Sequence, residues 1–277
     1  MSPTPPLSLY VHIPWCVRKC PYCDFNSHAL PAEASLESLE ARYIEALLKD
    51  LAAETELTGG REIGTVFIGG GTPSLFSGSV ISQLLEGIAA LACVAADAEI
   101  SLEANPGTAD AAFFATYRQG GVTRLSIGAQ SFDDRSLQKI GRIHSAAEAL
   151  DAFAMAATAG FHSINLDLMY GLPGQTLSAA MDDLRQAIEL APQHISWYQL
   201  TIEPNTVFHK RPPRLPVEDT LADIQQRGEA LLAGAGYPQY EVSAYSRPGF
   251  ECRHNLNSVS YTHLTLPTMR LRWRARW

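Results

Sequence analysis

Strand-like and helix-like segments alternate along most of this 277-residue chain, and that alternation restricts the fold more than any other feature. Short runs rich in aliphatic and aromatic residues predict six strands, at Leu7–Ile13, Thr65–Gly69, Glu99–Ala104, Arg124–Ala129, Ser163–Tyr170 and Ile195–Ile202. Longer amphipathic stretches predict helices at Leu36–Leu57, Val80–Ala92, Ala109–Arg118, Ala146–Ala159, Leu177–Leu190 and Thr220–Ala235. Six successive βα units require a parallel sheet with right-handed crossovers, so the predicted fold class is α/β.

The positions of the unusual residues distinguish between two α/β architectures. An open doubly wound sheet and a partial (β/α)6 barrel of the TIM type both fit the alternation. The cysteines, a glycine run and isolated carboxylates fall at or just past the carboxyl ends of successive predicted strands. Active sites of barrels lie at that end, so the partial barrel is the favoured prediction.

Composition divides the chain into three expected segments. We expect the partial barrel to occupy residues 1–210. A proline-rich loop then opens a second segment, 211–257, which is the start of a C-terminal extension and contains a short extended piece at Glu241–Ala244. The third segment, 258–277, carries four arginines and no carboxylate, whereas the residues before it have a net charge of −12.

Charge and cysteine content limit the surroundings in which this chain works. The formal net charge of −8 argues against a general binder of nucleic acid, and any membrane contact is expected to be transient. No stretch approaches the roughly 18 apolar residues of a membrane span, and Met1–Leu9 lacks the pattern of a secretory signal. Five cysteines, three of them within eight residues, fit a reducing compartment, so the expected location is the cytoplasm.

Cys16, Cys20 and Cys23 form a CxxxCxxC run directly after the first predicted strand. Thiolates bind iron–sulfur clusters, and a four-iron cluster needs four ligands. Three cysteines would leave one iron open to a small chelating molecule. A zinc site completed by His12 or His28 is the alternative, and it would make the chain a zinc-stabilised binding module without redox chemistry.

Further motifs accompany the next predicted strands. Gly69–Thr72 ends the second strand with a glycine run, which lets a ligand approach the backbone closely. Glu103 ends the third strand, where a carboxylate can accept two hydrogen bonds from a ribose diol. Gln130 ends the fourth strand and Arg142 follows it. Asp167 lies within the fifth strand, where an inward-facing carboxylate needs a partner, and Arg142 is one candidate.

Seven strings in this order resemble one branch of the radical S-adenosylmethionine (SAM) superfamily: YVHIPWC, CPYCDF, GGGTPS, SLEANP, GAQSFD, GRIHS and NLDLMYGLPGQT. That branch contains the oxygen-independent coproporphyrinogen III oxidases and the related HemW heme chaperones, and the resemblance covers about residues 7–257. It implies a [4Fe–4S] cluster on the three cysteines and SAM on the open iron. It also implies a reductant protein, whose electron allows SAM to be cleaved.

The resemblance also implies roles for individual residues. Tyr10, Gly70 and Glu103 would contact the cluster-bound SAM. The positions that in the oxidase contact a second SAM are Tyr22, Gly71, Thr72, Gln130, Arg142 and Asp167. Whether one or two SAM molecules bind stays open.

Two functions compete within this branch. An oxidase would decarboxylate porphyrinogen propionates, whereas a chaperone would bind heme as cargo and pass it to acceptor proteins. The oxidases carry a fourth cysteine two positions after the third, where this chain has Phe25, so the chaperone is favoured and the oxidase disfavoured. His254 begins a string like the HNxxYW linked to heme in the chaperones, and a neutral imidazole suits an axial iron position. Cys252 is another candidate ligand.

The resemblance ends abruptly. After Asn257 the family would continue with Tyr-Trp and a C-terminal domain, and that domain is expected to be missing here. Residues 258–277 are interpreted as a non-family tail that resembles frame-shifted sequence. A basic tail for heme propionates or lipid is the alternative.

Overall fold

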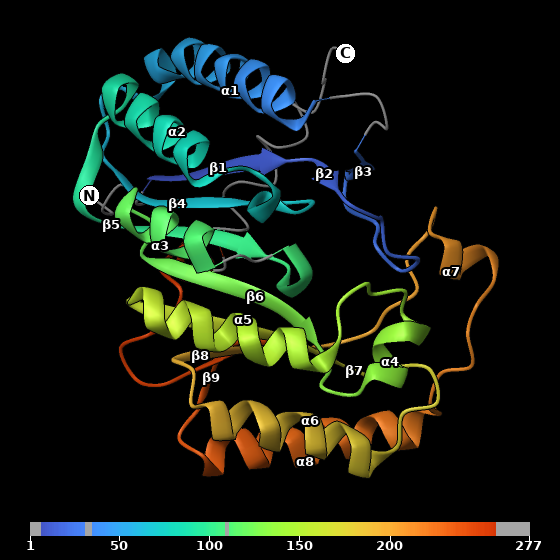
Figure 1. Cartoon of the computed structure of the whole chain (residues 1–277). Helices are drawn as coiled ribbons and strands as arrows, with labels where there is room; N and C mark the ends of the chain where they lie inside the picture. The colour runs from blue at the N-terminus through green and yellow to red at the C-terminus, as the bar shows by residue number, and fades with distance from the viewer. Residues whose placement is uncertain (1–6, 31–34, 109–110, 259–277) are drawn as a thin grey trace.

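A computed structural model describes residues 7–30, 35–108 and 111–258 (Figure 1). An eight-stranded sheet runs through them in the order β1-β4-β5-β6-β7-β8-β10-β9. The first six strands in that order are parallel, whereas β10 is antiparallel to β8 and to β9. The strands are β1 Leu7–Ile13, β4 Ile63–Gly70, β5 Val94–Ala104, β6 Arg124–Gln130, β7 Ser163–Tyr170, β8 His194–Gln199, β9 Gln239–Glu241 and β10 Ala244–Ser246.

Helices cover one face of the curled sheet and leave the concave face to the site (Figure 1). The large ones pack as neighbouring pairs: α1 with α2, α3 with α5, and α6 with α8. The helices are α1 Leu36–Thr58, α2 Gly78–Leu91, α3 Ala111–Gln119, α4 Asp134–Lys139, α5 Ala146–Ala159, α6 Leu177–Leu190, α7 Val207–Lys210 and α8 Glu218–Gly234. The predicted α/β class and partial barrel are confirmed.

Burial explains why these segments form strands with two different faces. Every residue of β6 is buried. Leu125, Ile127 and Ala129 belong to the core packed beneath the helices, whereas Ser126 and Gly128 line a cavity on the concave face. The alternation of side chains along a strand therefore separates an apolar layer from a polar one, and the polar layer belongs to the site.

Two predictions for the last strands were wrong in detail. The sixth strand was expected to reach Ile202 but ends at Gln199. The extended piece predicted at Glu241–Ala244 is interrupted, because Glu241 ends β9, Ala244 begins β10 and residues 242–243 form a hairpin turn between them. Val242 is 83% exposed at the tip of this turn.

The chain after β10 crosses the amino ends of the strands and closes the concave face there. Arg124 donates a hydrogen bond to the Phe250 carbonyl (2.7 Å), and the same guanidinium pairs with Glu99 (3.1 Å) in a largely buried ion pair. Further on, Asn257 donates to Ser8 of β1 (2.6 Å). The segment after β10 is thus hydrogen-bonded to two strands of the large sheet, β6 through Arg124 and β1 through Ser8.

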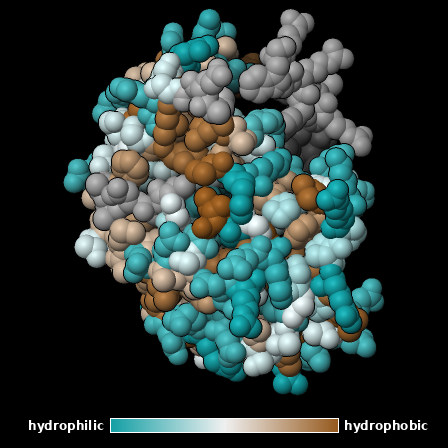
Figure 2. Space-filling view, turned by 45° about the vertical axis from the view of Figure 1, so that its right-hand side comes forward, coloured by the Kyte–Doolittle hydropathy of each residue, from teal (hydrophilic) through white to brown (hydrophobic). Residues whose placement is uncertain are grey.

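The surface shows an uneven distribution of apolar side chains. In Figure 2 hydrophobic residues gather in a patch in the upper half of the face shown, whereas the lower part is largely hydrophilic. Within the described ranges, no helix has both the length and the apolar character needed to cross a bilayer.

The contact between α8 and β8 yields a test of the packing. A Cβ on Gly228 would overlap the buried indole of Trp197, whereas a Cβ on Gly234 in the same helix would meet nothing within 4 Å. We predict that Gly228→Ala lowers the free energy of unfolding by about 1–3 kcal/mol through overpacking. Gly234→Ala should raise it by about 0.5–1 kcal/mol. Chemical denaturation measures both, and equal destabilisation by the two changes would contradict this packing.

Candidate functional site

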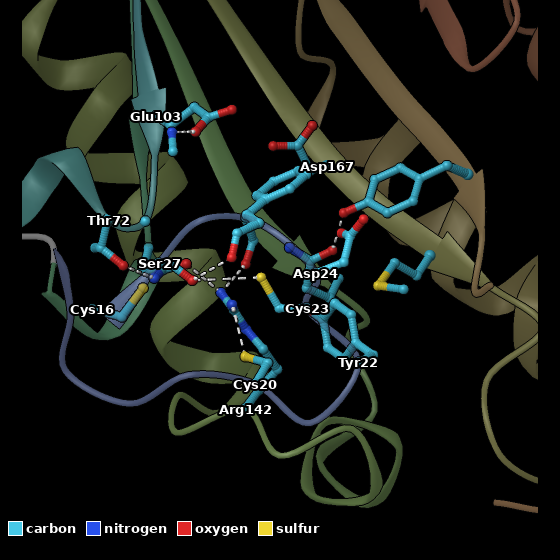
Figure 3. A pocket seen from close by; sticks show the side chains of 18 of the residues that line it. Cys16, Cys20, Tyr22, Cys23, Asp24, Ser27, Thr72, Glu103, Arg142 and Asp167 are labelled. Carbon is cyan, nitrogen blue, oxygen red and sulfur yellow. Dashed lines mark hydrogen bonds between the residues drawn. The ribbon is translucent and has the colours of Figure 1, made fainter. Parts of the chain in front are cut away.

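A cavity of about 340 Å³ lies where the carboxyl ends of the strands meet the cysteine-containing loop (Figure 3). Its size falls within the range of small-molecule sites. Eleven of the residues predicted from the sequence line it: Cys16, Cys20, Tyr22, Cys23, Gly70, Gly71, Thr72, Glu103, Gln130, Arg142 and Asp167. The fold therefore brings together motifs that are spread over about 150 residues of sequence.

The cysteine-containing loop, residues 16–28, is closed by a two-stranded ladder at its base. Strand β2 (Trp15–Cys16) pairs with β3 (His28–Ala29). Inside the loop, the Cys23 N–H donates to the Cys20 carbonyl (3.2 Å) and forms a turn. His12 Nε2 lies 2.8 Å from the Asn26 carbonyl and fixes the far side of the loop to β1. These contacts hold the three thiols on the cavity side.

The three thiols have polar neighbours, and Ser27 lies beside two of them (Figure 3). Burial raises the pKa of Cys16, and hydrogen bonds from the Thr72 and Ser27 hydroxyls oppose that rise by stabilising the thiolate. Cys23 Sγ lies 3.8 Å from Ser27 Oγ. Cys20 Sγ accepts from Arg142 Nη1 at 3.7 Å. The cavity thus places hydroxyl groups beside two thiols and a guanidinium beside the third.

The donor set fits an iron–sulfur cluster, because three cysteines line one cavity. Among the described residues, no three His, Cys, Asp or Glu side chains converge closely enough to bind one metal ion. Both histidines considered as zinc ligands have other contacts: His12 bridges Tyr10 and Asn26, and His28 contacts the Asn26 side chain (3.2 Å). In a cluster each thiolate binds a different iron, so the three sulfurs need not meet at one point.

The glycine run has a packing role toward the cysteine-containing loop. The Gly71 N–H donates to the Ile13 carbonyl (2.7 Å), and the Thr72 N–H donates to the Trp15 carbonyl (2.8 Å). A Cβ on Gly71 would lie 2.6 Å from the Trp15 oxygen. Gly70 has φ +119, which a larger residue rarely adopts. The loop that carries the cysteines can therefore sit against this segment only because the side chains are absent.

Glu103 is held in the cavity wall by that same backbone. The Gly70 N–H donates to Glu103 Oε2 (3.0 Å), and a Cβ on Gly69 would lie 3.0 Å from the same oxygen. Burial raises the pKa of Glu103 to about 7, the nearby Asp167 charge adds to the rise, and the Gly70 N–H opposes it. A carboxyl group so placed changes its charge near neutral pH.

Asp167 is satisfied by neutral partners. It accepts hydrogen bonds from Ser126 (2.7 Å) and Asn165 (2.8 Å). Burial raises its pKa, and these hydrogen bonds oppose the rise. The proposed ion pair with Arg142 is not formed, because the Arg142 guanidinium donates to Asn105, to the Gly128 carbonyl and to Cys20. Short polar side chains on neighbouring strands reach Asp167 more directly than the loop arginine does.

Several cavity residues were missed in the sequence. Tyr198 of β8 donates to Gln130 Oε1 (2.7 Å), and Gln130 itself has φ +68 at the end of β6. The period-2 alternation of β8 could have placed Tyr198 on the concave face with Ser196. Asn105 and Ser27 carried no comparable signal, because their roles depend on contacts with distant loops.

Two predicted residues lie outside the cavity. Tyr10 is 50% exposed on β1, and its hydroxyl lies 3.0 Å from His12 Nδ1. His254 lies at the opposite end of the concave face, where its Nδ1 is 3.1 Å from Thr65 Oγ1 and its ring packs on Phe67 at 5.0 Å between centroids. The fold does not bring His254 near the cysteines.

The class of protein is defined by a parallel half-barrel that carries three cysteines in the loop after its first strand. Residues 10–187 match the Radical SAM superfamily, whose members use an iron–sulfur cluster and SAM. Within it, the chain belongs to the HemW family of heme chaperones. It is 57% identical to HemW of Escherichia coli over 257 residues, 56% to that of Haemophilus influenzae over 261, and 39% to that of Mycobacterium tuberculosis over 262. These alignments cover 92–93% of this chain and 67% of each relative.

Solved structures agree with the assignment. The coproporphyrinogen III oxidase HemN of Escherichia coli, a radical SAM enzyme, superposes with a TM-score of 0.80 at 30% identity, over 90% of this chain and 57% of that one. Methylornithine synthase superposes with a TM-score of 0.53 at 13% identity, over 80% and 62% of the two chains, and shares the fold. The chain thus spans about two thirds of its curated relatives and little more than half of the oxidase.

The raised pKa of Glu103 predicts a pH-dependent stability. A carboxyl that binds its proton more tightly when folded stabilises the fold at low pH, and that stabilisation is lost as pH rises through about 7. We expect Glu103 to contribute a fall in the free energy of unfolding of the cluster-free protein between pH 5 and pH 8, whereas His144 and His194, whose pKa values are lowered by burial, contribute a rise. Glu103→Gln should remove about 2–3 kcal/mol of that fall.

Urea denaturation at several pH values measures this difference. Glu148→Gln is the matched control, since the Ser145 hydrogen bonds lower the pKa of Glu148, and its titration lies below this range. An unchanged slope in Glu103→Gln would contradict the assignment.

Proposed function

We propose that this chain binds one [4Fe–4S] cluster through Cys16, Cys20 and Cys23, and one SAM at the remaining iron. The observation that carries the proposal is the shared cavity, in which three thiols face a glycine backbone and the Glu103 carboxyl group. When bound and supplied with an electron by a reductant protein, the cluster provides the reducing power for SAM cleavage. The glycine backbone and Glu103, which lie opposite the thiols, are what would allow the cavity to hold SAM as well as a cluster.

The protein's own groups would hold and orient these ligands. Thr72 and Ser27 hydroxyls stabilise the Cys16 thiolate. The Gly70 N–H turns the Glu103 carboxylate toward the cavity, where it can accept both hydrogen bonds of a ribose diol. Tyr10 of β1 lies outside the cavity lining, and its proposed contact with the same SAM rests on the family resemblance. The remaining cavity residues, Tyr22, Gly71, Gln130, Arg142 and Asp167, are proposed to form the inner wall.

The second part of the proposal is heme transport. We infer that the chain binds heme and transfers it to acceptor proteins, in keeping with its 57% identity to a heme chaperone. Phe25, which stands where the oxidases have a fourth cysteine, supports this choice: it lines the cavity mouth, is 58% exposed and offers no thiol. The competing activity, porphyrinogen decarboxylation, is supported by the likeness to HemN.

The hydrogen bonds of His254 favour its proposed role as heme ligand. Thr65 donates its hydroxyl proton to Ser8 (2.7 Å), so Thr65 Oγ1 is left to accept from His254 Nδ1. That assignment puts the ring proton on Nδ1 and leaves the lone pair of Nε2 for iron. Burial also lowers the pKa of His254, which keeps the imidazole neutral at pH 7. To bind heme there, the helical turn 253–258 must expose Nε2.

Cysteine substitutions test the cluster. After anaerobic reconstitution, the wild-type chain should contain about four irons, and Cys16→Ser, Cys20→Ser or Cys23→Ser should each lose most of them. Cys93→Ser changes an exposed thiol outside the cavity and should retain the iron. Iron and zinc analysis measures the result. Zinc retained in place of iron would support the zinc-stabilised binding module instead.

Heme titration tests the cargo. His254→Ala should abolish stoichiometric heme binding, and Thr65→Val should weaken it about tenfold by removing the partner of Nδ1. Arg253→Gln changes an exposed side chain in the same turn and should bind heme normally. An equal loss of heme binding in all three variants would mean that heme binding depends on the structure of the turn and not on the His254 imidazole. Conversion of coproporphyrinogen III by the wild type, with SAM and reductant, would reject the carrier function.

A further inference from the structure

Arg142 is fixed in place by groups other than the cysteine that it contacts. Its Nη2 donates to Asn105 Oδ1 and to the Gly128 carbonyl (2.8 Å), while Nη1 points to Cys20 Sγ at 3.7 Å. Asn105 is itself anchored, because its Nδ2 donates to Thr72 Oγ1 (2.8 Å). The direction of the guanidinium is therefore imposed by the ends of β5 and β6.

The loop that carries Arg142 is also fastened to the cysteine-containing loop. Gly141 has φ +73, and a Cβ there would lie 2.6 Å from Pro21 Cδ. Arg18, between the first two cysteines, donates to the Gly141 carbonyl. The two loops thus hold one another in register, and the contact between Arg142 and Cys20 does not depend on a flexible side chain alone.

The three thiols consequently differ in their electrostatic surroundings. Cys16 and Cys23 have neutral hydroxyl neighbours, whereas Cys20 has a permanent positive charge on an N–H donor. A donor to a ligating sulfur stabilises the more negative, reduced form of a cluster. A cation enclosed by protein is screened far less than one in water.

We propose that Arg142 is a positioning residue that raises the reduction potential of the cluster through Cys20. The proposal rests on the proposed cluster at the three cysteines. One electron enters from an external one-electron donor, and the guanidinium stabilises the charge that this electron adds. No proton transfer is involved, because arginine stays protonated in proteins.

Anaerobic redox titration followed by electron paramagnetic resonance tests this role. At a fixed ambient potential, Arg142→Gln should decrease the ratio of reduced to oxidised cluster about tenfold, which is a downward shift of about 59 mV for a one-electron couple. Arg142→Lys keeps the positive charge but lacks the planar guanidinium, so its ratio of reduced to oxidised cluster should lie between those of the wild type and Arg142→Gln. Arg135→Gln removes an equal charge from the exposed side of α4 and should leave the ratio unchanged.

The outcomes separate this inference from the proposed function. A wild-type chain that takes up no iron would overturn the cluster itself. A chain with full iron content, whose potential is the same in the wild type and in Arg142→Gln, would overturn only the role of Arg142. If Arg142→Gln loses its iron, the same redox titration is made on Asn105→Leu. This change removes one hydrogen-bond acceptor that orients the Arg142 guanidinium and leaves the arginine itself in place. A lower ratio of reduced to oxidised cluster in Asn105→Leu supports the proposal. A ratio equal to that of the wild type in both Asn105→Leu and Arg142→Lys rejects it.

Discussion

The site depends on one close contact between backbones, where the cysteine-containing loop lies against the glycine run at the end of β4. Two hydrogen bonds, from Gly71 to Ile13 and from Thr72 to Trp15, continue the pairing of β1 and β4 beyond the sheet. Side chains at Gly70 or Gly71 would separate the two segments. Because Thr72 reaches Cys16 and Gly70 holds Glu103, a shift at this contact would disturb both walls of the cavity.

The polar groups of the concave face are satisfied largely by neutral partners rather than by ion pairs. Asp167 accepts from Ser126 and Asn165, and Gln130 accepts from Tyr198. Neutral hydrogen bonds avoid the desolvation of a second charge, which makes buried ion pairs weak sources of stability. They also leave Arg142 available to Cys20. The Arg142 guanidinium thus contacts a thiol directly while neutral acceptors hold it in place.

Periodicity and motif spacing carried much of the prediction, and its failures have physical causes. Six parallel strands followed from periodicity. The eleven cavity residues followed from the family resemblance together with the rule that strand ends in a parallel sheet meet at one edge. The hydrogen-bond partners of Asp167 did not follow from the sequence. Arg142 was a candidate because it follows a neighbouring strand, but its guanidinium donates to Asn105 and to the Gly128 carbonyl instead. The hairpin at Val242 was missed because a two-residue turn leaves no mark in hydrophobic periodicity. Domain boundaries and the individual residue roles remain predictions.

The cofactor end and the proposed cargo end occupy opposite ends of the same concave face. Thr65, which contacts His254, and Gly70, which contacts Glu103, are five residues apart on β4, a separation of roughly 16 Å along a strand. Phe67 lies between them, packed against the ring of His254 and close to Gly69. An oxidase must bring its substrate to the SAM. A carrier has no such requirement, and the separation is therefore compatible with heme transport.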